Sequence, residues 1–558
     1  MRPASIQSIQ EAFSEGLSQA EWSDLRGPRG ETRCVDGLLG STEALFVDQL
    51  RDRAAGTESG PIVCIVPDAE FAAYLFADLE LIRGTSGADE MRIFPVSGVR
   101  PYDREQTTIP DSQVQRMDVV LALQEGFSGV VVASAESVAE RVPAPDILRD
   151  DVPLVRVGDQ MDPETLMEQL GSLGFSVQDF VEEPGEVAYR GGIIDVFPFA
   201  GQHPVRIEFF GDEIDTIREF DPGSQRSVSH VSSARLVPDP TGLTAGSAAG
   251  SFFSFLPDRT TLVVVEPGRV LEAVRSVYEE AVAARDLAAG KDGVDAFPEV
   301  DERYLAKDFV SKSLGLLGGL RIVARCDAPD IHFAVSAPPV FSKSIKVLRK
   351  KIEENTARDW DTIILCDGKG QMGRLDELLG GSRDGFFYGL ELASLHQGFE
   401  LPGARLAVYT DHQIFNRYHR PRVRKPADAG PRLSLQQLAS LKPGDFVVHV
   451  DYGIGRFAGL ETIEVRGRDQ EVVRLLYESD DLLYVNINSL HRLHKYSNRE
   501  GHRPKLTRLG SGQWEKAKNR TKRRVKDIAR DLIKLYAERK SGDGYAFSED
   551  TVWQRELE

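Results

Sequence analysis

Residues 61–79 read PIVCIVPDAEFAAYLFADL, and this stretch decides the class of fold. Its first six residues form a short apolar run that is typical of a strand buried on both faces. Asp68 follows as a helix N-cap, and apolar residues then recur at helical spacing. Residues 92–95 and 129–134 are further short strands, and a helix follows the second from Ala135. Strands that alternate with helices predict a parallel sheet with helices on its faces.

The pattern changes after residue 150. Residues 189–198 (YRGGIIDVFP) and 205–211 (VRIEFFG) are strands separated by a polar turn, and residues 213–221 mostly alternate polar with apolar. The alternation of helices and strands resumes near Phe252. We therefore expect an antiparallel α+β domain inserted into one larger α/β domain.

Three further parts are expected in the rest of the chain. Helices alternate with strands at 343–425, which predicts a small α/β domain. Five short strands between 441 and 493 predict a small SH3-like or Tudor-like β-barrel. Residues 513–540 predict a long basic helix, whose interspersed acidic residues allow internal pairing. Contact of this helix with a DNA backbone is the alternative.

The bulk composition excludes several classes of function. The chain has 558 residues, which suggests roughly three to five domains. Its net charge of -19 argues against a surface dedicated to nucleic acid. The 4 cysteines are far apart, so we expect reduced core residues and no metal site. No leader or membrane-spanning stretch is apparent, so we expect a cytoplasmic protein without a membrane partner.

Residues 36–46 (DGLLGSTEALF) stand where a phosphate-binding loop would follow the first strand. In the motif Gly-x-x-x-x-Gly-Lys-Ser/Thr, backbone N–H groups wrap the phosphates and the lysine neutralises them. Gly37 can serve as the first glycine, but Thr42 replaces the second glycine and Glu43 replaces the lysine. Glu43 would place negative charge where phosphates need positive charge. The predicted inactive nucleotide loop comprises Gly40, Ser41, Thr42 and Glu43.

Several of these stretches resemble UvrB, the damage-verifying subunit of bacterial excision repair. The closest likeness is in residues 190–198 and 206–214, and residues 37–40 look like the first half of that family's phosphate loop. Residues 97–103 (SGVRPYD) carry one tyrosine where UvrB has a tyrosine-rich damage-clamping hairpin. The predicted barrel has no counterpart in UvrB.

The degenerate loop, the single tyrosine and the added barrel all fit the bacterial transcription-repair coupling factors. Residues 410–415 (TDHQIF) and 443–457 (PGDFVVHVDYGIGRF) look like that family's linker-domain and barrel signatures. The likeness covers nearly the whole chain and ends near Phe547, where the family's translocase would begin. This resemblance implies an N-terminal segment (1–32), UvrB-like domains 1a (33–150), 2 (151–238) and 1b (239–342), a small α/β domain (343–425), a linker (426–436), a CarD-like RNA-polymerase-interacting barrel (437–505), and a connecting helix with the start of the translocase (506–558).

The resemblance also implies two binding surfaces. A UvrA-binding surface is expected at Arg190, Arg206, Glu208 and Phe210. Each arginine precedes a carboxylate, so internal salt bridges are an alternative role for them. An RNA-polymerase-binding surface is expected at Ile463, Val473 and Leu475, which belong to the hairpin strands of the barrel. Strand addition to the barrel would give affinity through backbone hydrogen bonds, and a barrel that serves only as a spacer is the alternative.

The function implied is that of the front half of a coupling factor. It would bind stalled RNA polymerase through the β subunit and recruit UvrA for transcription-coupled nucleotide excision repair. We expect no catalytic residues and no cofactor in this part. ATP, Mg and double-stranded DNA would belong to the downstream translocase of helicase superfamily 2. The alternatives are a UvrB-like repair ATPase, against which Thr42 and Glu43 argue, and a stand-alone polymerase-binding transcription regulator.

Overall fold

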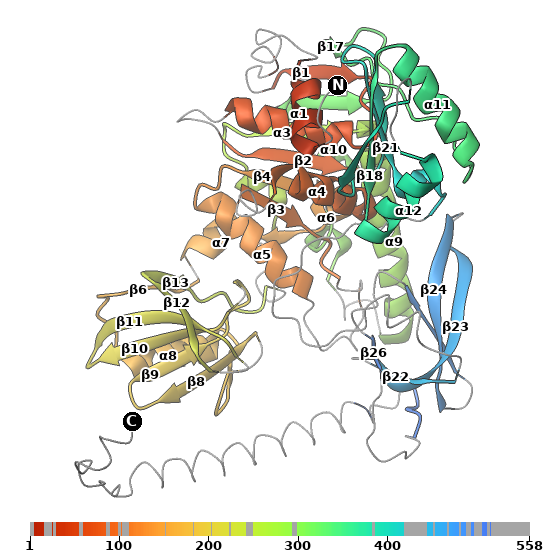
Figure 1. Cartoon of the computed structure of the whole chain (residues 1–558). Helices are drawn as coiled ribbons and strands as arrows, with labels where there is room; N and C mark the ends of the chain where they lie inside the picture. The colour runs from red at the N-terminus through yellow and green to blue at the C-terminus, as the bar shows by residue number, and fades with distance from the viewer. Residues whose placement is uncertain are drawn as a thin grey trace, which may run out of the picture. The chain divides into compact units, whose positions relative to one another are not determined.

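Figure 1 shows the fold as a computed structural model of the whole chain. The chain divides into two compact units, residues 1–424 and 425–558. The structure describes residues 5–15, 25, 30–54, 60–84, 90–98, 102, 111–150, 152–181, 184–201, 203–222, 225–240, 249–292, 298–381, 386–417, 444–449, 452–465, 468–478, 481–486, 493–495, 505–509 and 514.

A large parallel sheet organises the first unit, as the sequence predicted. Its strand order is β17-β1-β16-β15-β2-β4-β3, and all neighbouring strands run parallel. Every residue of β2 and β4 is buried, which explains their continuous apolar sequences. The strands are β1 (Thr32–Asp36), β2 (Ile62–Val66), β3 (Met91–Phe94), β4 (Val130–Ser134), β15 (Thr261–Val265), β16 (Gly319–Val323) and β17 (Ile331–His332).

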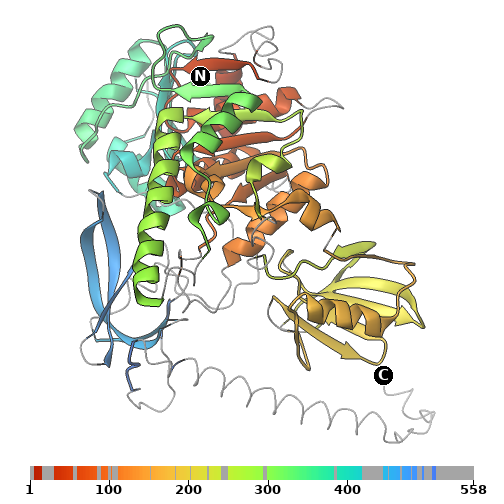
Figure 2. The ribbon, with the colours of Figure 1, turned by 180° about the vertical axis from the view of Figure 1, so that it is seen from behind.

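Helices cover both faces of this sheet. Helices α1 (Ile6–Ser14), α3 (Thr42–Ala54) and α4 (Ala69–Arg83) pack on one face. Helices α5 (Asp111–Gln124), α9 (Pro267–Asp292) and α10 (Lys307–Leu317) pack on the other, and Figure 2 shows α9 and α10 there. Two short helices, α6 (Ala135–Ala139) and α7 (Pro145–Asp150), follow β4.

Two departures from the sequence predictions concern buried residues. Helix α1 was not predicted, although its Ile9 and Phe13 are buried in the core. Of the cysteines expected in the core, Cys64 and Cys366 are buried, whereas the other two are partly exposed; all four are free thiols. None of the helices in the described ranges combines the length and apolar composition needed to cross a membrane.

A second sheet lies between β4 and β15 in the sequence, so the chain leaves the parallel sheet and later returns to it. This six-stranded sheet has the order β12-β11-β10-β9-β8-β7 and is antiparallel except between β7 and β8. Helix α8 (Pro163–Ser172) packs on one face through Leu166 and Leu170. The strands are β7 (Ser176–Val177), β8 (Glu186–Arg190), β9 (Ile193–Val196), β10 (Val205–Phe210), β11 (Glu213–Phe220) and β12 (Ser227–Val231). Two small ladders flank this sheet in the sequence, β6 (Leu154–Arg156) with β13 (Ser233–Arg235) and β5 (Val142–Pro143) with β14 (Ala249–Gly250).

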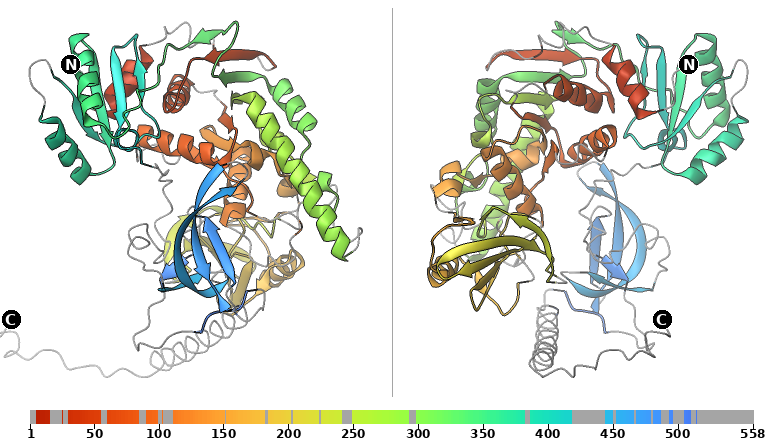
Figure 3. Two further views of the ribbon diagram at one scale, coloured as in Figure 1. Left: turned by 90° about the vertical axis from the view of Figure 1, so that its right-hand side faces the viewer. Right: turned by 60° about the vertical axis from the view of Figure 1, so that its left-hand side comes forward.

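The small α/β domain has a four-stranded sheet in the order β19-β18-β21-β20. Its strands are β18 (Asp361–Cys366), β19 (Gly389–Leu392), β20 (Phe399–Leu401) and β21 (Leu406–Thr410), and its helices are α11 (Ile345–Ala357), α12 (Lys369–Leu379) and the short α13 (Asp411–Ile414). Helices α11 and α12 cover one face of this sheet. The other face packs into the same core as α1, α3 and α4, and Figure 3 shows the small sheet between these two sets of helices.

The second unit contains a five-stranded antiparallel sheet in the order β25-β24-β23-β22-β26. The strands are β22 (Phe446–His449), β23 (Gly453–Val465), β24 (Arg468–Leu476), β25 (Leu482–Asn486) and β26 (Leu493–Lys495). Strands β23 and β24 form the hairpin that the sequence predicted. Within the described residues β25 and β26 stand at opposite edges, so closure into a barrel stays a prediction. The predicted linker at 426–436 lies outside the described residues, as does the helix at 513–540 except for Trp514.

Candidate functional site

Strand β10 presents three of the four residues predicted to bind UvrA on one face, and the fourth, Arg190, ends β8. Val205 and Ile207 are buried in the domain core. Because alternate residues of a strand share a face, Arg206, Glu208 and Phe210 lie on the opposite side. The pairing of β10 with β11 shifts between Glu208 and Phe209, but the extra residue is Asp215 of β11. The alternation of faces along β10 is therefore uninterrupted. The sequence expectation that these three side chains share a surface is therefore consistent with the geometry.

The buried carboxylate of Asp195 organises the arginines on this face. Arg206 binds it with two contacts, Nε to Oδ1 at 2.7 Å and Nη2 to Oδ2 at 2.9 Å, and Arg190 Nη2 binds Oδ2 at 2.5 Å. Asp195 is 0% exposed, whereas the side chains of Arg206 and Arg190 are 18% and 39% exposed. Each guanidinium also lies 4.5 Å from the centre of a ring, Arg206 over Phe220 and Arg190 over Phe180. The arginines therefore neutralise a buried charge and present fixed N–H groups at the surface.

Glu208 has a different partner from the one its sequence position suggests. Its carboxylate pairs with Arg218 and accepts a hydrogen bond of 2.8 Å from the Thr216 hydroxyl, both on β11. Arg206 instead reaches Asp195, its cross-strand neighbour on β9. These two separate ion-paired groups, Arg190 and Arg206 with Asp195 and Arg218 with Glu208, are together called the charged network of this sheet. Sequence reasoning missed Arg218 and the shared role of Asp195, because both depend on strand register.

Phe210 ends β10 and is the most exposed residue of the candidate surface. It is 84% exposed, whereas the neighbouring Phe209 packs against the core. A two-residue turn follows, and its first residue Gly211 has φ of +66°. A positive φ there is typical of the tight turns that join hairpin strands. A single exposed phenylalanine is common on protein surfaces. Phe210 is a candidate contact residue because it lies beside the charged network.

The loop remnant, residues 37–43, runs from the end of β1 into the first turn of α3, and its geometry opposes phosphate binding. Gly37 has φ of +78°, and a Cβ at this position would lie 2.0 Å from the Phe333 carbonyl oxygen. The Thr42 hydroxyl accepts a hydrogen bond of 2.9 Å from the Leu39 N–H and donates to the Leu39 carbonyl at 2.8 Å. An N–H group that a phosphate loop would offer to its ligand is thus already bonded to the residue that replaced the second glycine.

The other predicted loop residues face protein. Gly40 has φ of +58°, and a Cβ there would lie 2.8 Å from the Cβ of Gln397 in the small α/β domain. Ser41 is buried, and its hydroxyl donates to Asp78 Oδ2 at 2.6 Å. The space beside the loop remnant is therefore filled by another segment of the chain. No sequence motif signalled this, because it depends on how two domains pack.

Position 43 also lacks the positive charge that an anionic ligand needs, because Glu43 stands where the motif has a lysine. Burial, and then the charges of Glu266 and Asp78, raise its pKa to about 8, while Arg269 acts in the opposite direction. Burial likewise raises the pKa of Asp78 to about 7, although hydrogen bonds from Ser41 and the His396 amide lower it. Glu43 is therefore largely protonated near pH 7, so it supplies neither the negative charge expected from the sequence nor the positive charge of the missing lysine.

The predicted polymerase-binding residues need a correction. Val473 and Leu475 are both 0% exposed and lie in the core of the C-terminal sheet with Phe457 and Val485. They support the sheet and do not reach a partner directly. The backbone of β24 is also paired on both sides, with β23 and β25, so it offers no free edge. The side chain of Ile463 lies outside the described residues, so its role stays a prediction.

Exposed apolar side chains lie elsewhere on this sheet. Leu482 and Tyr484 of β25 are 47% and 43% exposed. They stand opposite Leu476 and Arg474 of β24, on the face away from Val473 and Leu475. Arg474 is held there by Glu461, with Nη1 and Oε2 3.2 Å apart. We call Arg474, Leu476, Leu482 and Tyr484 the outer face of the C-terminal sheet.

Comparisons with known proteins match both binding regions. Residues 154–241 match the UvrB interaction domain, and residues 441–497 match the CarD-like/TRCF RID domain. The chain is 28% identical to the transcription-repair-coupling factor of Bacillus subtilis (strain 168), over 94% of this chain and 50% of that protein. It is 25% identical to the protein of the same name from Staphylococcus aureus (strain USA300), over 84% of this chain and 46% of that protein. The chain thus spans about half the length of these relatives, and the resemblance drawn from the sequence is confirmed.

Proposed function

We propose that this chain bridges RNA polymerase and UvrA in transcription-coupled nucleotide excision repair. The C-terminal sheet would bind stalled polymerase, and the six-stranded sheet would recruit UvrA. One observation carries the proposal: a UvrB interaction domain at 154–241 and a CarD-like/TRCF RID domain at 441–497 occur in a single chain. A stand-alone transcription regulator would need only the second of these domains.

The UvrA contact is assigned to the exposed side of β10. Arginines and aromatic residues are enriched among the side chains that dominate protein interfaces, and this surface combines exposed Phe210 with Arg190 and Arg206. Asp195 holds both guanidinium groups in fixed orientations, which reduces the entropy lost on binding. Arg190 is the more exposed arginine, so it is the one placed to contact carboxylates of a partner.

The polymerase contact is assigned to the outer face of the C-terminal sheet, with the β subunit as the expected partner. Leu482 and Tyr484 supply exposed apolar area on β25, which is an edge strand within the described part of the sheet. An edge strand can accept a strand of a partner through backbone hydrogen bonds, while alternate side chains give specificity. The buried Val473 and Leu475 would maintain the shape of this surface.

The remaining activities belong to the whole protein. An ATP-dependent DNA translocase that displaces polymerase from lesions, with its ATP, Mg and double-stranded DNA, is assigned to the half of the relatives that this chain does not span. We assign no nucleotide to the loop remnant, because Thr42 occupies the Leu39 N–H and Glu43 supplies no positive charge in place of the lysine. A UvrB-like repair ATPase is therefore disfavoured for this chain.

A bridging assay tests the proposal. Immobilised RNA polymerase should retain UvrA only when the chain is added. Phe210→Asp should abolish UvrA retention while the chain stays on polymerase, and Tyr484→Asp should remove both from the resin. Val228→Asp is a control on a separate exposed apolar side chain of the six-stranded sheet, 56% exposed, and should have no effect. Polymerase that binds the chain but never retains UvrA would contradict the bridging role.

A further inference from the structure

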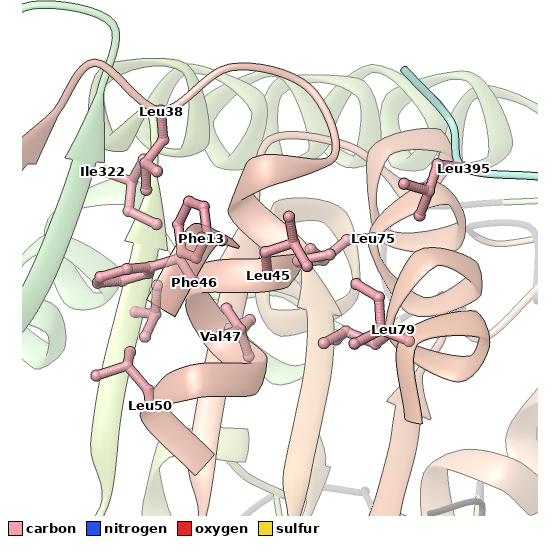
Figure 4. Close-up of a cluster of buried hydrophobic side chains, with 14 of the residues drawn as sticks. Phe13, Leu38, Leu45, Phe46, Val47, Leu50, Leu75, Leu79, Ile322 and Leu395 are labelled. Atoms are coloured by element: carbon pink, nitrogen blue, oxygen red, sulfur yellow. The ribbon is translucent and has the colours of Figure 1, made fainter. Parts of the chain in front are cut away.

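The small α/β domain packs on the parallel-sheet domain through one continuous core. Leu395 follows β19 and is 0% exposed. Figure 4 shows it among buried side chains of α3 and α4, close to Leu75 and Leu79. The next residue, His396, stacks its ring on Tyr74 of α4, with the ring centres 3.6 Å apart. The segment after β19 therefore reaches across the domain boundary and lies against α4.

Polar contacts continue this packing into the loop remnant. The His396 N–H donates to Asp78 Oδ1 at 2.7 Å, and the Gln397 N–H donates to the Ser41 hydroxyl at 3.0 Å. Ser41 in turn donates to the second oxygen of Asp78. Asp78 and Ser41 are both buried, so these bonds satisfy groups that would be costly to leave unpaired. Two consecutive backbone N–H groups thus point from the small α/β domain at acceptors beside the loop.

The segment is also held from its own domain, by the motif at 410–415. Nε2 of His412 lies 2.9 Å from the His396 carbonyl oxygen, which can only accept a hydrogen bond. The Gly398 N–H donates to Gln413 Oε1 at 2.7 Å. This motif stood out in the sequence, and the partner-binding surfaces give it no role. Here it positions residues 396–398.

We propose that the loop remnant is an intramolecular docking site whose ligand is the peptide segment 395–398. The hydrogen-bonding direction of a phosphate loop is reversed at this site. A phosphate loop offers N–H donors to an anion, whereas this site offers the acceptors Asp78 and Ser41 to a segment that brings N–H donors. The segment occupies the space beside Gly40, so docking of the small α/β domain and phosphate binding exclude each other.

The reversed direction also explains the charge at the site. Both oxygens of Asp78 accept hydrogen bonds, one from the His396 N–H and one from the Ser41 hydroxyl, and Glu43 offers no cation to a phosphate. Residues 40–43 are thus specialised to hold a neighbouring domain, which is a different role from a nucleotide site that has simply decayed. The consequence is mechanical, because the docked segment fixes the small α/β domain to the parallel-sheet domain.

Hydrogen exchange of the whole 558-residue chain tests this site, read by mass spectrometry on peptides that contain residues 395–398. Gly40→Ala places a methyl group 2.8 Å from the Gln397 Cβ. We expect the amides of residues 396 and 397 to exchange at least about tenfold faster, as befits local opening of a docked segment. Gly380→Ala is the matched control, because Gly380 also has a positive φ, of +77°, but nothing lies within 4 Å of its added Cβ.

A second variant approaches the site from the small α/β domain. Gln413→Ala removes the acceptor of the Gly398 N–H, and the amide of Gly398 should exchange about tenfold faster because a partly buried hydrogen bond is lost. Gln169→Ala, at an exposed glutamine of α8, serves as the control. Wild-type exchange at residues 396–398 in both Gly40→Ala and Gln413→Ala would overturn the proposal. Equal acceleration by Gly380→Ala and Gly40→Ala would also overturn it, because general backbone strain would then explain the result.

Discussion

Phe210→Ala separates binding from folding more cleanly than any other change on the candidate UvrA surface. Phe210 is 84% exposed, so its removal costs the folded chain almost no packing. Complete burial of a phenylalanine side chain contributes about 1.5–3 kcal/mol. If UvrA covers Phe210, 84% of that range is gained on binding, about 1.3–2.5 kcal/mol. The dissociation constant for UvrA should therefore rise roughly 10- to 70-fold.

Arg206→Ala provides the contrast. Arg206 makes two of the three contacts to the buried Asp195 carboxylate, and only the contact from Arg190 would remain. A buried acceptor that loses its main partner costs about 1–3 kcal/mol. The melting temperature should fall by several degrees, which would weaken UvrA binding for two reasons at once. Charge reversal at Arg206 would also break its contacts with the buried Asp195, so a loss of UvrA binding in that variant would not by itself identify the contact surface.

Isothermal titration of UvrA into the chain, paired with thermal unfolding of each variant, measures both effects. Phe210→Ala should leave the melting temperature within about a degree of the wild type. Val228→Ala, at a side chain that is 56% exposed on β12, should change neither measurement. Phe210→Ala with wild-type affinity would refute the placement of UvrA on this face. A large fall in its melting temperature would refute the claim that Phe210 has no structural role.

Three further predictions concern the loop remnant and the C-terminal sheet. The pKa of Glu43 is about 8 in the folded chain, above the ordinary value of 4.5. Between pH 4.5 and 8 the folded state therefore binds more protons than the unfolded state, and the free energy of unfolding should fall as pH rises through this range. Glu43→Gln should flatten this dependence in denaturant titrations at several pH values. Thr42→Gly, Glu43→Lys and Ala44→Ser together restore the missing motif residues. This triple variant should gain no ATP binding in a fluorescence titration, because the docked segment still fills the site; saturable binding would contradict this. Leu475→Ala removes a fully buried side chain and should destabilise the C-terminal sheet by about 2–5 kcal/mol. Tyr484→Ala should weaken polymerase capture and leave the melting curve unchanged. If Leu475→Ala instead weakened capture without destabilising the sheet, Leu475 would belong to the binding surface.

The parts of the fold that could be predicted are those in which local pattern and burial agree. Strands β2 and β4 are apolar throughout because both of their faces are covered. The inserted sheet could be predicted because strand alternation replaces helical spacing there. Helix α1 was missed although the sequence signals it, because Ser5 is its N-cap and Ile6, Ile9 and Phe13 recur at helical spacing. Their burial depends on the neighbouring α3 and α4, which local pattern does not report.

The candidate surfaces show a similar division. The resemblance assigned Arg206, Glu208 and Phe210 to one surface, and the period of two along a strand agrees with that assignment. The partner of each charge could not be predicted in this way, because it depends on register: Arg206 lies opposite Asp195 across β9, and Glu208 lies opposite Thr216 on β11. For Val473 and Leu475 the same alternation was available, but nothing in the sequence said which face of the C-terminal sheet is covered.

The loop remnant shows how local hydrogen bonds can remove the donors that a phosphate needs. Thr42 does more than remove a glycine, because its hydroxyl bonds the Leu39 N–H and so removes a donor from the loop. Once that donor is satisfied, an anion gains little there, whereas a peptide that brings its own donors gains the acceptors Asp78 and Ser41. A returning lysine would then have to displace a segment that is bonded at both ends and anchored by the buried Leu395. The small α/β domain and the parallel-sheet domain would have to separate before a phosphate could enter.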